Sequence, residues 1–348
     1  MKNLIKVKKL LNTYNLDAYI IPKNDEFFGE YASPNRLKTI SNFSGSAGFS
    51  IITKFVNYLF VDGRYSIQSK MESGKNFKII EIPYHYPKNI LNTNIINKIG
   101  YDPKLFTRST LERYFGYKFQ LIPINTNLVD EIFQEQRNKE KMFFKLDDKI
   151  VGESEHSKIN RLFKVLNKNK SDSIFISAPE NVAWLLNIRG QDNPNSPIPN
   201  ARLIISKTKK ILLISKLEKC KKLIYKKVIK KNQFIDIDKF PKEIARLNGK
   251  NFIIDDKSCS IFYENLIKSK FKIVEREDPS YFFKSVKNKT EIKNMIDAHI
   301  LDGVALTKFI FWIKKINKKK ITEVQAAEKL EKFRKMHKSF LYPVNEFC

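Results

Sequence analysis

The order helix, strand, helix, glycine-bearing turn and hairpin occurs twice in this chain, and this repeat constrains the fold more than any other feature. In the first copy, a helix over residues 2–14 and a strand over residues 18–21 lead to a hairpin within residues 49–61. In the second copy, a strand over residues 173–177 leads to a hairpin within residues 201–215. Helices that alternate with apolar, β-branched strands are typical of a sheet covered by helices. We therefore predict the α/β fold class, with two similar domains in tandem.

The first hairpin lies in the segment Asn42 to Tyr65, NFSGSAGFSIITKFVNYLFVDGRY. Because glycine lacks a Cβ atom, Gly45 and Gly48 predict a tight turn before the first strand. Arg64 stands where the second strand ends, ahead of a helical segment that Gly74 closes. An arginine in this place can form forked, charge-assisted hydrogen bonds to a carboxylate or a carbonyl. The alternative is an exposed arginine that pairs with a neighbouring acid.

The pattern changes after Lys284. We expect Thr290 to cap a long helix whose apolar residues recur at 3.6-residue spacing as far as Ile313. A second helix is predicted to begin at Thr322, which can form a capping box with Gln325. Both helices carry an apolar stripe that needs a partner surface, so we expect the chain to self-associate.

Composition narrows the choice of partners and compartment. No apolar run approaches the ~18 residues of a membrane span, so we expect no membrane partner. The three cysteines are far apart and odd in number, which favours a reducing, cytoplasmic location without disulfide bonds. The formal net charge of +28 attracts anionic surfaces. However, the lysines are dispersed and no nucleic-acid recognition motif accompanies them, so nucleic acid is not the expected partner.

Five segments connect the chain to a known family: SGSAG, DGRY, AWLLNIRGQD, AHILDGVAL and TEVQAAEKLEKFR. In their order and spacing, over about residues 16–343, they resemble the Xaa-Pro aminopeptidases (aminopeptidase P) of the larger three-domain type. The resemblance implies two tandem creatinase-type, ribonuclease-H-like α/β domains over residues 1–145 and 146–284. It also implies that residues 285–348 begin a pita-bread peptidase domain, which would be incomplete.

The resemblance also implies an activity, which is the release of an N-terminal residue that precedes proline. A centre of two manganese ions performs this reaction in the family, usually in homodimers, and proline-containing peptides are the expected ligands. By the same likeness, Arg64 in DGRY matches a position that contributes to substrate binding. The chain departs from the family in PKNDEFFGEY, where Glu26-Phe27 replaces an acidic residue followed by histidine.

The residues themselves show no catalytic or metal site. The histidines, His85, His156, His299 and His337, are isolated, and we expect His299 on its apolar stripe to be a packed core residue. Adjacent acids such as Asp147-Asp148 and Asp255-Asp256 point apart and are interpreted as solvated or capping groups. Ser46 resembles a nucleophile elbow but precedes a strand instead of joining a strand to a helix. Arg64 is thus the one predicted site residue, and neither a catalytic residue nor a metal ligand is predicted.

The family's metal ligands all follow the TEVQAAEKLEKFR helix, and the final VNEFC departs from the family pattern. We therefore expect this chain to be truncated by a lost reading frame or an early stop. Alone, it is predicted to hold no manganese and to hydrolyse no Xaa-Pro peptide. Two alternatives remain, namely the N-terminal subunit of a split peptidase and a basic remnant that binds peptides or nucleic acid.

Overall fold

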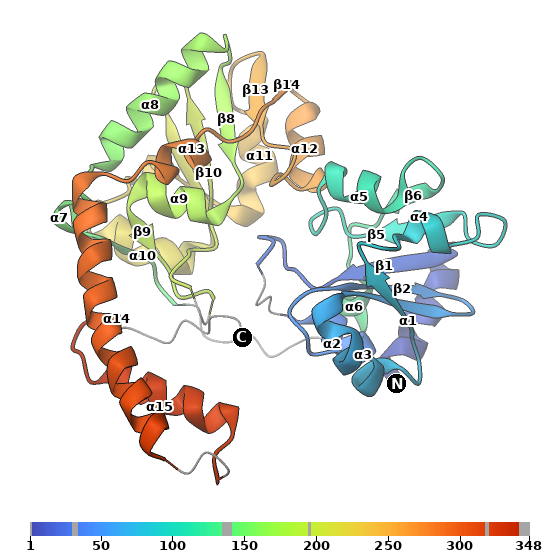
Figure 1. Ribbon diagram of the computed structural model, residues 1–348. Helices are drawn as coiled ribbons and strands as arrows, with labels where there is room; N and C mark the ends of the chain where they lie inside the picture. Colours follow the sequence, from blue (N-terminus) through green and yellow to red (C-terminus); the bar gives the residue numbers. More distant parts are fainter. Residues whose placement is uncertain (1, 30–33, 134–140, 194–195, 317–319, 341–348) are drawn as a thin grey trace.

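The computed structural model describes residues 2–29, 34–133, 141–193, 196–316 and 320–340. Two six-stranded sheets, each with its own helices, lie side by side, and a pair of long helices extends from the second (Figure 1). Domain I denotes the unit built on the first sheet, and domain II the unit built on the second. No helix in the described part of the chain has both the length and the hydropathy that a membrane crossing requires.

Domain I is built on a mixed sheet. Its strands are β1 (Ala18–Pro22), β2 (Phe49–Thr53), β3 (Asn57–Asp62), β4 (Lys78–Ile82), β5 (Lys98–Tyr101) and β6 (Gln120–Pro123). Its helices are α1 (Lys2–Thr13), α2 (Arg36–Ser41), the 3₁₀ turn η1 (Gly63–Tyr65), α3 (Ser66–Ser73), α4 (Pro87–Ile90), α5 (Arg108–Phe115) and α6 (Leu128–Ile132). The hydrogen-bonded order is β4-β3-β2-β1-β5-β6, in which the β1–β2 and β2–β3 pairs are antiparallel and the others parallel.

Domain II repeats this arrangement. Its strands are β8 (Ser173–Ile176), β10 (Arg202–Ser206), β11 (Ile211–Ser215), β12 (Phe234–Asp236), β13 (Asn251–Ile254) and β14 (Lys272–Glu275). Its helices are α7 (Asp148–Val151), α8 (Glu155–Lys168), α9 (Pro179–Leu186), α10 (Leu217–Tyr225), η2 (Lys231–Gln233), η3 (Ile237–Lys239), α11 (Phe240–Ile244), α12 (Ile261–Lys268) and α13 (Ser280–Ser285). A separate antiparallel pair consists of β7 (Phe144–Lys145) and β9 (Ile188–Arg189).

The two sheets share one topology. The order of the second, β12-β11-β10-β8-β13-β14, corresponds strand by strand to that of the first, with the same parallel and antiparallel pairs. The predicted α/β fold class and the predicted repeat are therefore confirmed. The hairpins β2–β3 and β10–β11 lie at the expected places.

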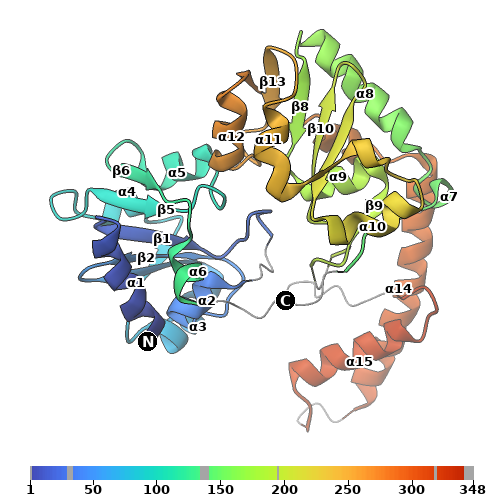
Figure 2. The ribbon, with the colours of Figure 1, turned by 180° about the vertical axis from the view of Figure 1, so that it is seen from behind.

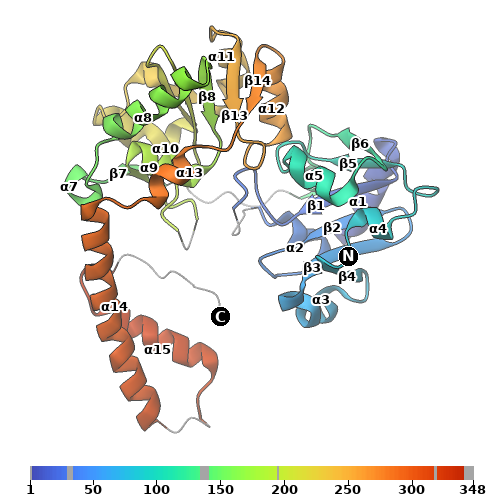
Figure 3. The same cartoon turned by 45° about the horizontal axis from the view of Figure 1, so that its top comes forward.

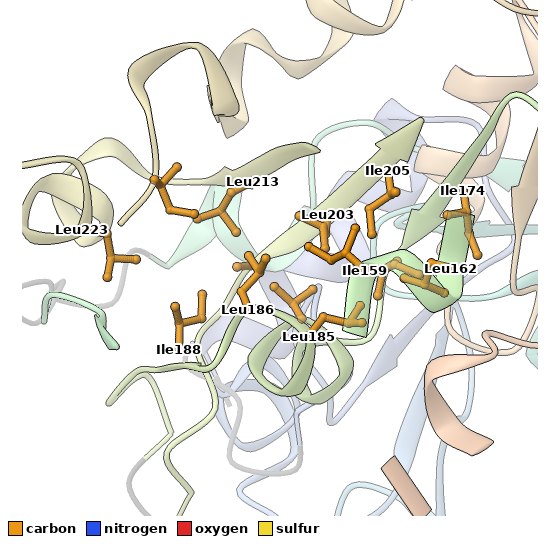
Figure 4. Packing of buried hydrophobic residues seen from close by; sticks show 14 of the residues in the cluster. Ile159, Leu162, Ile174, Leu185, Leu186, Ile188, Leu203, Ile205, Leu213 and Leu223 are labelled. Carbon is orange, nitrogen blue, oxygen red and sulfur yellow. The ribbon is translucent and has the colours of Figure 1, made fainter. Parts of the chain in front are cut away.

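Both faces of each sheet are covered by apolar side chains. In β1, Tyr19 and Ile21 belong to the cluster that includes α1, whereas Ala18 and Ile20 belong to the cluster on the opposite face. Successive residues of a strand point to opposite faces, so a sheet buried on both sides needs an uninterrupted apolar run. In domain II, side chains from β8, β10 and β11 likewise pack against those of α8 and α9 (Figure 4).

A buried carboxylate follows the fifth strand of each domain. Asp102 accepts hydrogen bonds from the Lys104 N–H at 2.9 Å and from Asn127 Nδ2 at 2.9 Å. Asp255 occupies the equivalent place and accepts the Asp278 N–H at 3.1 Å. Of the two interpretations of this acid, solvated or capping, the structure supports capping, because Asp255 is buried and also accepts the Lys257 N–H at 3.0 Å.

These loops join the two domains. The main-chain N–H groups of Ile261 and Phe262, at the start of α12, donate to the carbonyls of Phe106 and Pro103 at 2.9 and 3.0 Å. Ser109 in α5 donates to a carbonyl in the loop before α12 at 3.4 Å. Helices α5 and α12 therefore face each other across the boundary, as Figures 1, 2 and 3 show from three directions.

The N-cap of the long helix α14 (Lys289–Lys315) lies two residues before the expected Thr290. Asn288 is the N-cap, because its side chain accepts the Glu291 N–H while the Glu291 carboxylate accepts the Asn288 N–H. Asn288 Nδ2 also donates to the Val151 carbonyl at 2.8 Å. The same residue therefore caps α14 and attaches it to domain II.

Helix α15 (Glu323–Lys335) begins at the predicted capping box of Thr322 and Gln325. It packs on α14, where Arg334 forms two hydrogen bonds to Asp302 at 2.6 and 3.0 Å. Most of α14 nevertheless stays uncovered by the described residues. Its exposed apolar side chains are Ile292, Met295, Ile296, Ile300, Leu301, Val304, Leu306, Ile310 and Phe311.

Candidate functional site

Arg64 lies in the short 3₁₀ turn η1, between β3 and α3. The turn begins at Asp62, whose carboxylate accepts the Arg64 N–H at 3.0 Å and the Arg64 Nε and Nη2 atoms at 3.1 and 2.8 Å. These bonds to Arg64 hold the pKa of Asp62 below its usual value. The Arg64 side chain is 56% exposed, so its guanidinium faces solvent while one acid orients it.

The turn before β2 lies against this arginine turn. Gly48 has a φ of +147°, and a Cβ atom there would lie 2.7 Å from the Phe60 carbonyl, so the position requires glycine. Ser46 Oγ lies 2.7 Å from the Tyr65 hydroxyl, and the Tyr65 ring packs edge-on against Phe43. The predicted tight turn therefore positions the residue next to Arg64.

A carboxylate links the start of this turn to α3. Glu72 accepts hydrogen bonds from the Ser44 N–H and from Ser44 Oγ, both at 2.7 Å, and from Gln68 Nε2 at 3.1 Å. Burial acts to raise the pKa of Glu72, but these hydrogen bonds outweigh it and lower the pKa. Glu72 therefore stays ionised and fastens the glycine turn to the helix that follows Arg64.

This arrangement is suited to binding, because it offers an exposed guanidinium on a short, hydrogen-bonded turn. The fork of an arginine matches a carboxylate or a carbonyl, and Asp62 occupies part of it in this structure. Both sequence interpretations of Arg64 therefore fit the geometry, namely the ion pair with a neighbouring acid and the solvent-facing binding group. Substrate binding by Arg64 stays a prediction.

The other candidate residues do not converge. His85, His156 and His299 are exposed and belong to separate segments. The expectation that His299 is a packed core residue is wrong, because the described residues do not cover that face of α14. Ser46 Oγ lies 2.7 Å from the Tyr65 hydroxyl, which is not a general base of the kind a serine nucleophile needs. Among the described residues, no group of three or more His, Cys, Asp or Glu side chains is arranged to hold a metal ion.

Sequence reasoning missed the residues at the domain boundary. Arg202 begins the apolar strand β10 and is almost completely buried, with its guanidinium 4.1 Å from the centroid of the Phe27 ring. The sequence feature that could have indicated Arg202 is a charged residue at the start of an apolar strand. If it is buried, such a residue needs a partner from another element. Phe27 stands where the resembled family usually carries histidine, and here it contacts a cation.

Known protein families match the two domains separately. Residues 4–132 and residues 134–291 each match the Creatinase/Prolidase N-terminal domain, so the fold and its repeat define a protein with two tandem creatinase-type domains. The two matched domains together cover most of the chain, which therefore belongs to the creatinase/prolidase N-terminal domain family. Its relatives along almost its whole length are Xaa-Pro aminopeptidases.

Two curated relatives illustrate the similarity. Xaa-Pro aminopeptidase 1 of Dictyostelium discoideum is 29% identical over 369 residues, which cover 98% of this chain and 58% of the relative. A probable Xaa-Pro aminopeptidase P of Paracoccidioides brasiliensis is 31% identical, with 98% of this chain and 60% of the relative covered. The chain thus spans about three fifths of the length of these relatives.

A solved structure shows the same fold. The X-prolyl aminopeptidase of Caenorhabditis elegans, described as a cytosolic enzyme with a di-nuclear active site, superimposes with a TM-score of 0.84 at 22% sequence identity. The match covers 98% of this chain and 60% of the worm protein. Domains I and II and the helices that follow are therefore arranged as in the worm protein.

Proposed function

We propose that this chain forms the two N-terminal domains and the first two peptidase-domain helices of an Xaa-Pro aminopeptidase. The observation that carries the proposal is the similarity to Xaa-Pro aminopeptidases over 98% of the chain. Proline-containing peptides are the proposed ligands, and a second copy of the chain is the proposed partner. The lysines are spread over both domains, which supports a solvating role for them and not nucleic-acid binding.

In this proposal Arg64 contacts the peptide substrate. Three features support the role: its exposed guanidinium, its short turn, and its orientation by Asp62. A peptide carbonyl or carboxylate would share the fork with Asp62 or displace it. Because the ion pair with Asp62 is exposed to solvent, its rearrangement costs little free energy.

The metal chemistry is assigned to residues outside this chain. The family member from Caenorhabditis elegans has a di-nuclear active site, and two ions bridged by carboxylates can generate hydroxide near neutral pH. The donor groups in the described part of this chain do not fit such a centre. We therefore propose that the chain alone neither holds manganese nor hydrolyses Xaa-Pro peptides.

The exposed faces of α14 and α15 support a role within a larger assembly. An apolar helix face is stable when another surface covers it, and the relatives contain further residues that could do so. This observation favours a second candidate function, in which the chain is the N-terminal subunit of a peptidase whose catalytic part is a separate polypeptide.

A chimera tests these proposals. Residues 1–343 would be followed by the corresponding remainder of the Dictyostelium discoideum relative and assayed with an Arg-Pro-Pro peptide and manganese. We expect chelator-sensitive release of arginine by the chimera and none by the 348-residue chain. Substitution Arg64→Gln in the chimera should lower kcat/KM by about 10- to 100-fold, the loss expected for one charged hydrogen bond.

Three outcomes would contradict parts of the proposal. Release of arginine by the unmodified chain, or manganese bound to it stoichiometrically after gel filtration, would refute the assignment of the metal centre elsewhere. An inactive but folded chimera would argue against the peptidase role. An unchanged kcat/KM for Arg64→Gln, with Arg246→Gln as an exposed control, would remove Arg64 from the substrate site.

A further inference from the structure

Arg202 is a buried cation at the boundary between the two domains. It is the first residue of β10, and its side chain is 2% exposed. A buried guanidinium is costly unless acceptors and neutralising groups surround it. The groups that surround Arg202 therefore determine whether its burial at the start of β10 is stable.

Most of these groups belong to domain I. Arg202 Nη2 donates to the Glu26 carbonyl at 2.5 Å and lies 3.7 Å from the Glu26 carboxylate. The guanidinium carbon lies 4.1 Å from the centroid of the Phe27 ring, in the same loop after β1. Domain II contributes the Tyr263 ring, whose centroid is 4.2 Å away.

No acceptor for Arg202 Nη1 is found in the described part of the chain, so the aromatic faces compensate the charge there. A cation over an aromatic face gains more when water is excluded from it. If domain I moved away, Arg202 would lose both the hydrogen bond and the ion pair to Glu26 together with the Phe27 face. The burial of Arg202 is therefore stabilised only when the loop after β1 of domain I is in contact with it.

The Arg202 contact is separate from the main-chain hydrogen bonds at the start of α12. Those bonds join one loop of domain I to one helix of domain II, and by themselves they leave rotation about that attachment open. The ion pairs of Arg108 with Glu264 and Glu275 lie on the same side of the boundary, close to α12. The loop after β1 adds an attachment at a different element, the start of β10. Attachments on different elements restrict the angle between the domains as well as their distance.

We propose that Arg202 is a positioning residue that locks domain I onto domain II in a single orientation. Arg64 belongs to domain I, whereas α14 and α15 are attached to domain II through Asn288. The lock therefore sets where Arg64 lies relative to the helices that begin the peptidase region. Only this last consequence rests on the proposed function.

A distance measurement on the full chain tests the lock. Spin labels would be placed at the exposed positions of Lys70→Cys in α3 and Lys168→Cys in α8, in a Cys348→Ser background. The remaining cysteines, Cys220 and Cys259, are buried, and burial raises the pKa of each thiol, so they resist labelling. We expect the distance distribution to become at least twice as broad with Arg202→Met.

Two further variants make the result specific. Phe27→Leu removes the aromatic face from the domain I side and should broaden the distribution in the same way, even if Arg202→Met does not fold. The control Arg246→Met removes an arginine that is 74% exposed and pairs with Glu243 of α11, in the same domain. It should leave the distance distribution unchanged. Unchanged widths for both Arg202→Met and Phe27→Leu would overturn the proposal.

A kinetic arm separates the lock from the proposed function. In the chimera, Arg202→Met should lower kcat/KM for the Arg-Pro-Pro peptide about as much as Arg64→Gln does, and the double variant should lose little more. A broadened distribution with unchanged kinetics would keep the lock and refute its consequence for Arg64. Additive losses would refute that consequence as well.

Discussion

The guanidinium of Arg108, the first residue of α5 in domain I, lies 2.5 Å from a carboxylate oxygen of Glu264 in α12 of domain II. The Glu264 side chain is 6% exposed, whereas that of Arg108 is 40% exposed. A buried acid of one domain is therefore neutralised by an arginine from the other. Arg108 also lies 2.6 Å from Glu275 at the end of β14, which extends the network along the boundary.

Substitution Arg108→Met is expected to destabilise the chain by about 1–3 kcal/mol, because it leaves the Glu264 carboxylate buried without its partner. Urea unfolding measures the loss. The double variant Arg108→Met/Glu264→Gln should recover part of it, since no buried charge remains. Equal stability of the single and double variants would show that Glu264 does not need Arg108.

An added methyl group is expected to have opposite effects on stability at Gly48 and at Gly303. Gly48→Ala should destabilise by about 1–3 kcal/mol, because φ is +147° and the new Cβ would meet the Phe60 carbonyl. Gly303→Ala in α14 has nothing within 4 Å of the new Cβ and should stabilise by about 0.5–1 kcal/mol through helix propensity. Thermal unfolding of both variants compares them directly, and similar shifts in Tm would contradict the turn geometry.

Asp172 predicts a loss of stability in acid. Its pKa is lowered to about 2 by Lys207 and by the N–H groups of Lys250 and Asn251. Because the folded pKa lies below the unfolded value, the stabilisation is present above pH 4 and disappears as the pH falls towards 2. Asp172→Asn should cost about 1 kcal/mol at pH 7, less than the full shift implies because the site is near solvent.

The measurement for Asp172 is urea unfolding from pH 7 to pH 2. The difference in unfolding free energy between the parent and Asp172→Asn should shrink to near zero at the acid end. A difference that is independent of pH would show that the amide loses packing or hydrogen bonds and not a charge interaction.

Lys158 predicts a gain of stability in alkali. It is buried in α8, and its Nζ donates to the Trp184 carbonyl and to Asn187 Oδ1 at 2.9 and 2.6 Å. Burial lowers its pKa from 10.5 to about 8. Between pH 8 and 10.5 the unfolded chain binds more protons, so the unfolding free energy contributed by Lys158 rises with pH.

The slope from this one proton is at most about 1.4 kcal/mol per pH unit. Lys158→Met should remove it, whereas Lys164→Met, on the exposed side of the same helix, should not. Guanidinium unfolding at pH 8, 9 and 10 measures the slope. Identical slopes for the parent and Lys158→Met would contradict the lowered pKa.

The exposed face of α14 predicts a change in association without a change in folding. Ile296→Gln and Ile300→Gln replace side chains that are 55% and 60% exposed. We expect less binding of a hydrophobic dye and less aggregation, with the stability of domains I and II within about 0.5 kcal/mol. A loss of more than 2 kcal/mol would show that this face is covered in solution by a part of the same chain.

Much of the fold was predictable because its local signals agree. The hairpins lie where β-branched runs flank polar turns, and β2 and β11 match their expected residues without a shift. Helix α15 begins at the capping box that Thr322 and Gln325 predict. The short parallel strands β5 and β6 were not predicted, because four residues give no clear period and their partners are distant in sequence.

The candidate site was predictable only in part. Arg64 could be singled out by its place at the end of an apolar strand, but its pairing with Asp62 and the support from Ser46 and Tyr65 depend on how the loops pack. The contact of Arg202 with Glu26 crosses 176 residues of sequence. No local pattern encodes such a contact, so Arg202 and its partner Glu26 were not predicted.

The contact between α5 and α12 has the form of a self-complementary contact within one chain. The beginning of each helix touches the loop before the other, as in the self-complementary contact of a symmetric dimer, here with both halves in one polypeptide. A contact of that type is closed, since each half uses the same edge to engage its counterpart. Both halves of the contact are thus used within one polypeptide, so the edge formed by the start of α5 and the start of α12 holds domains I and II together.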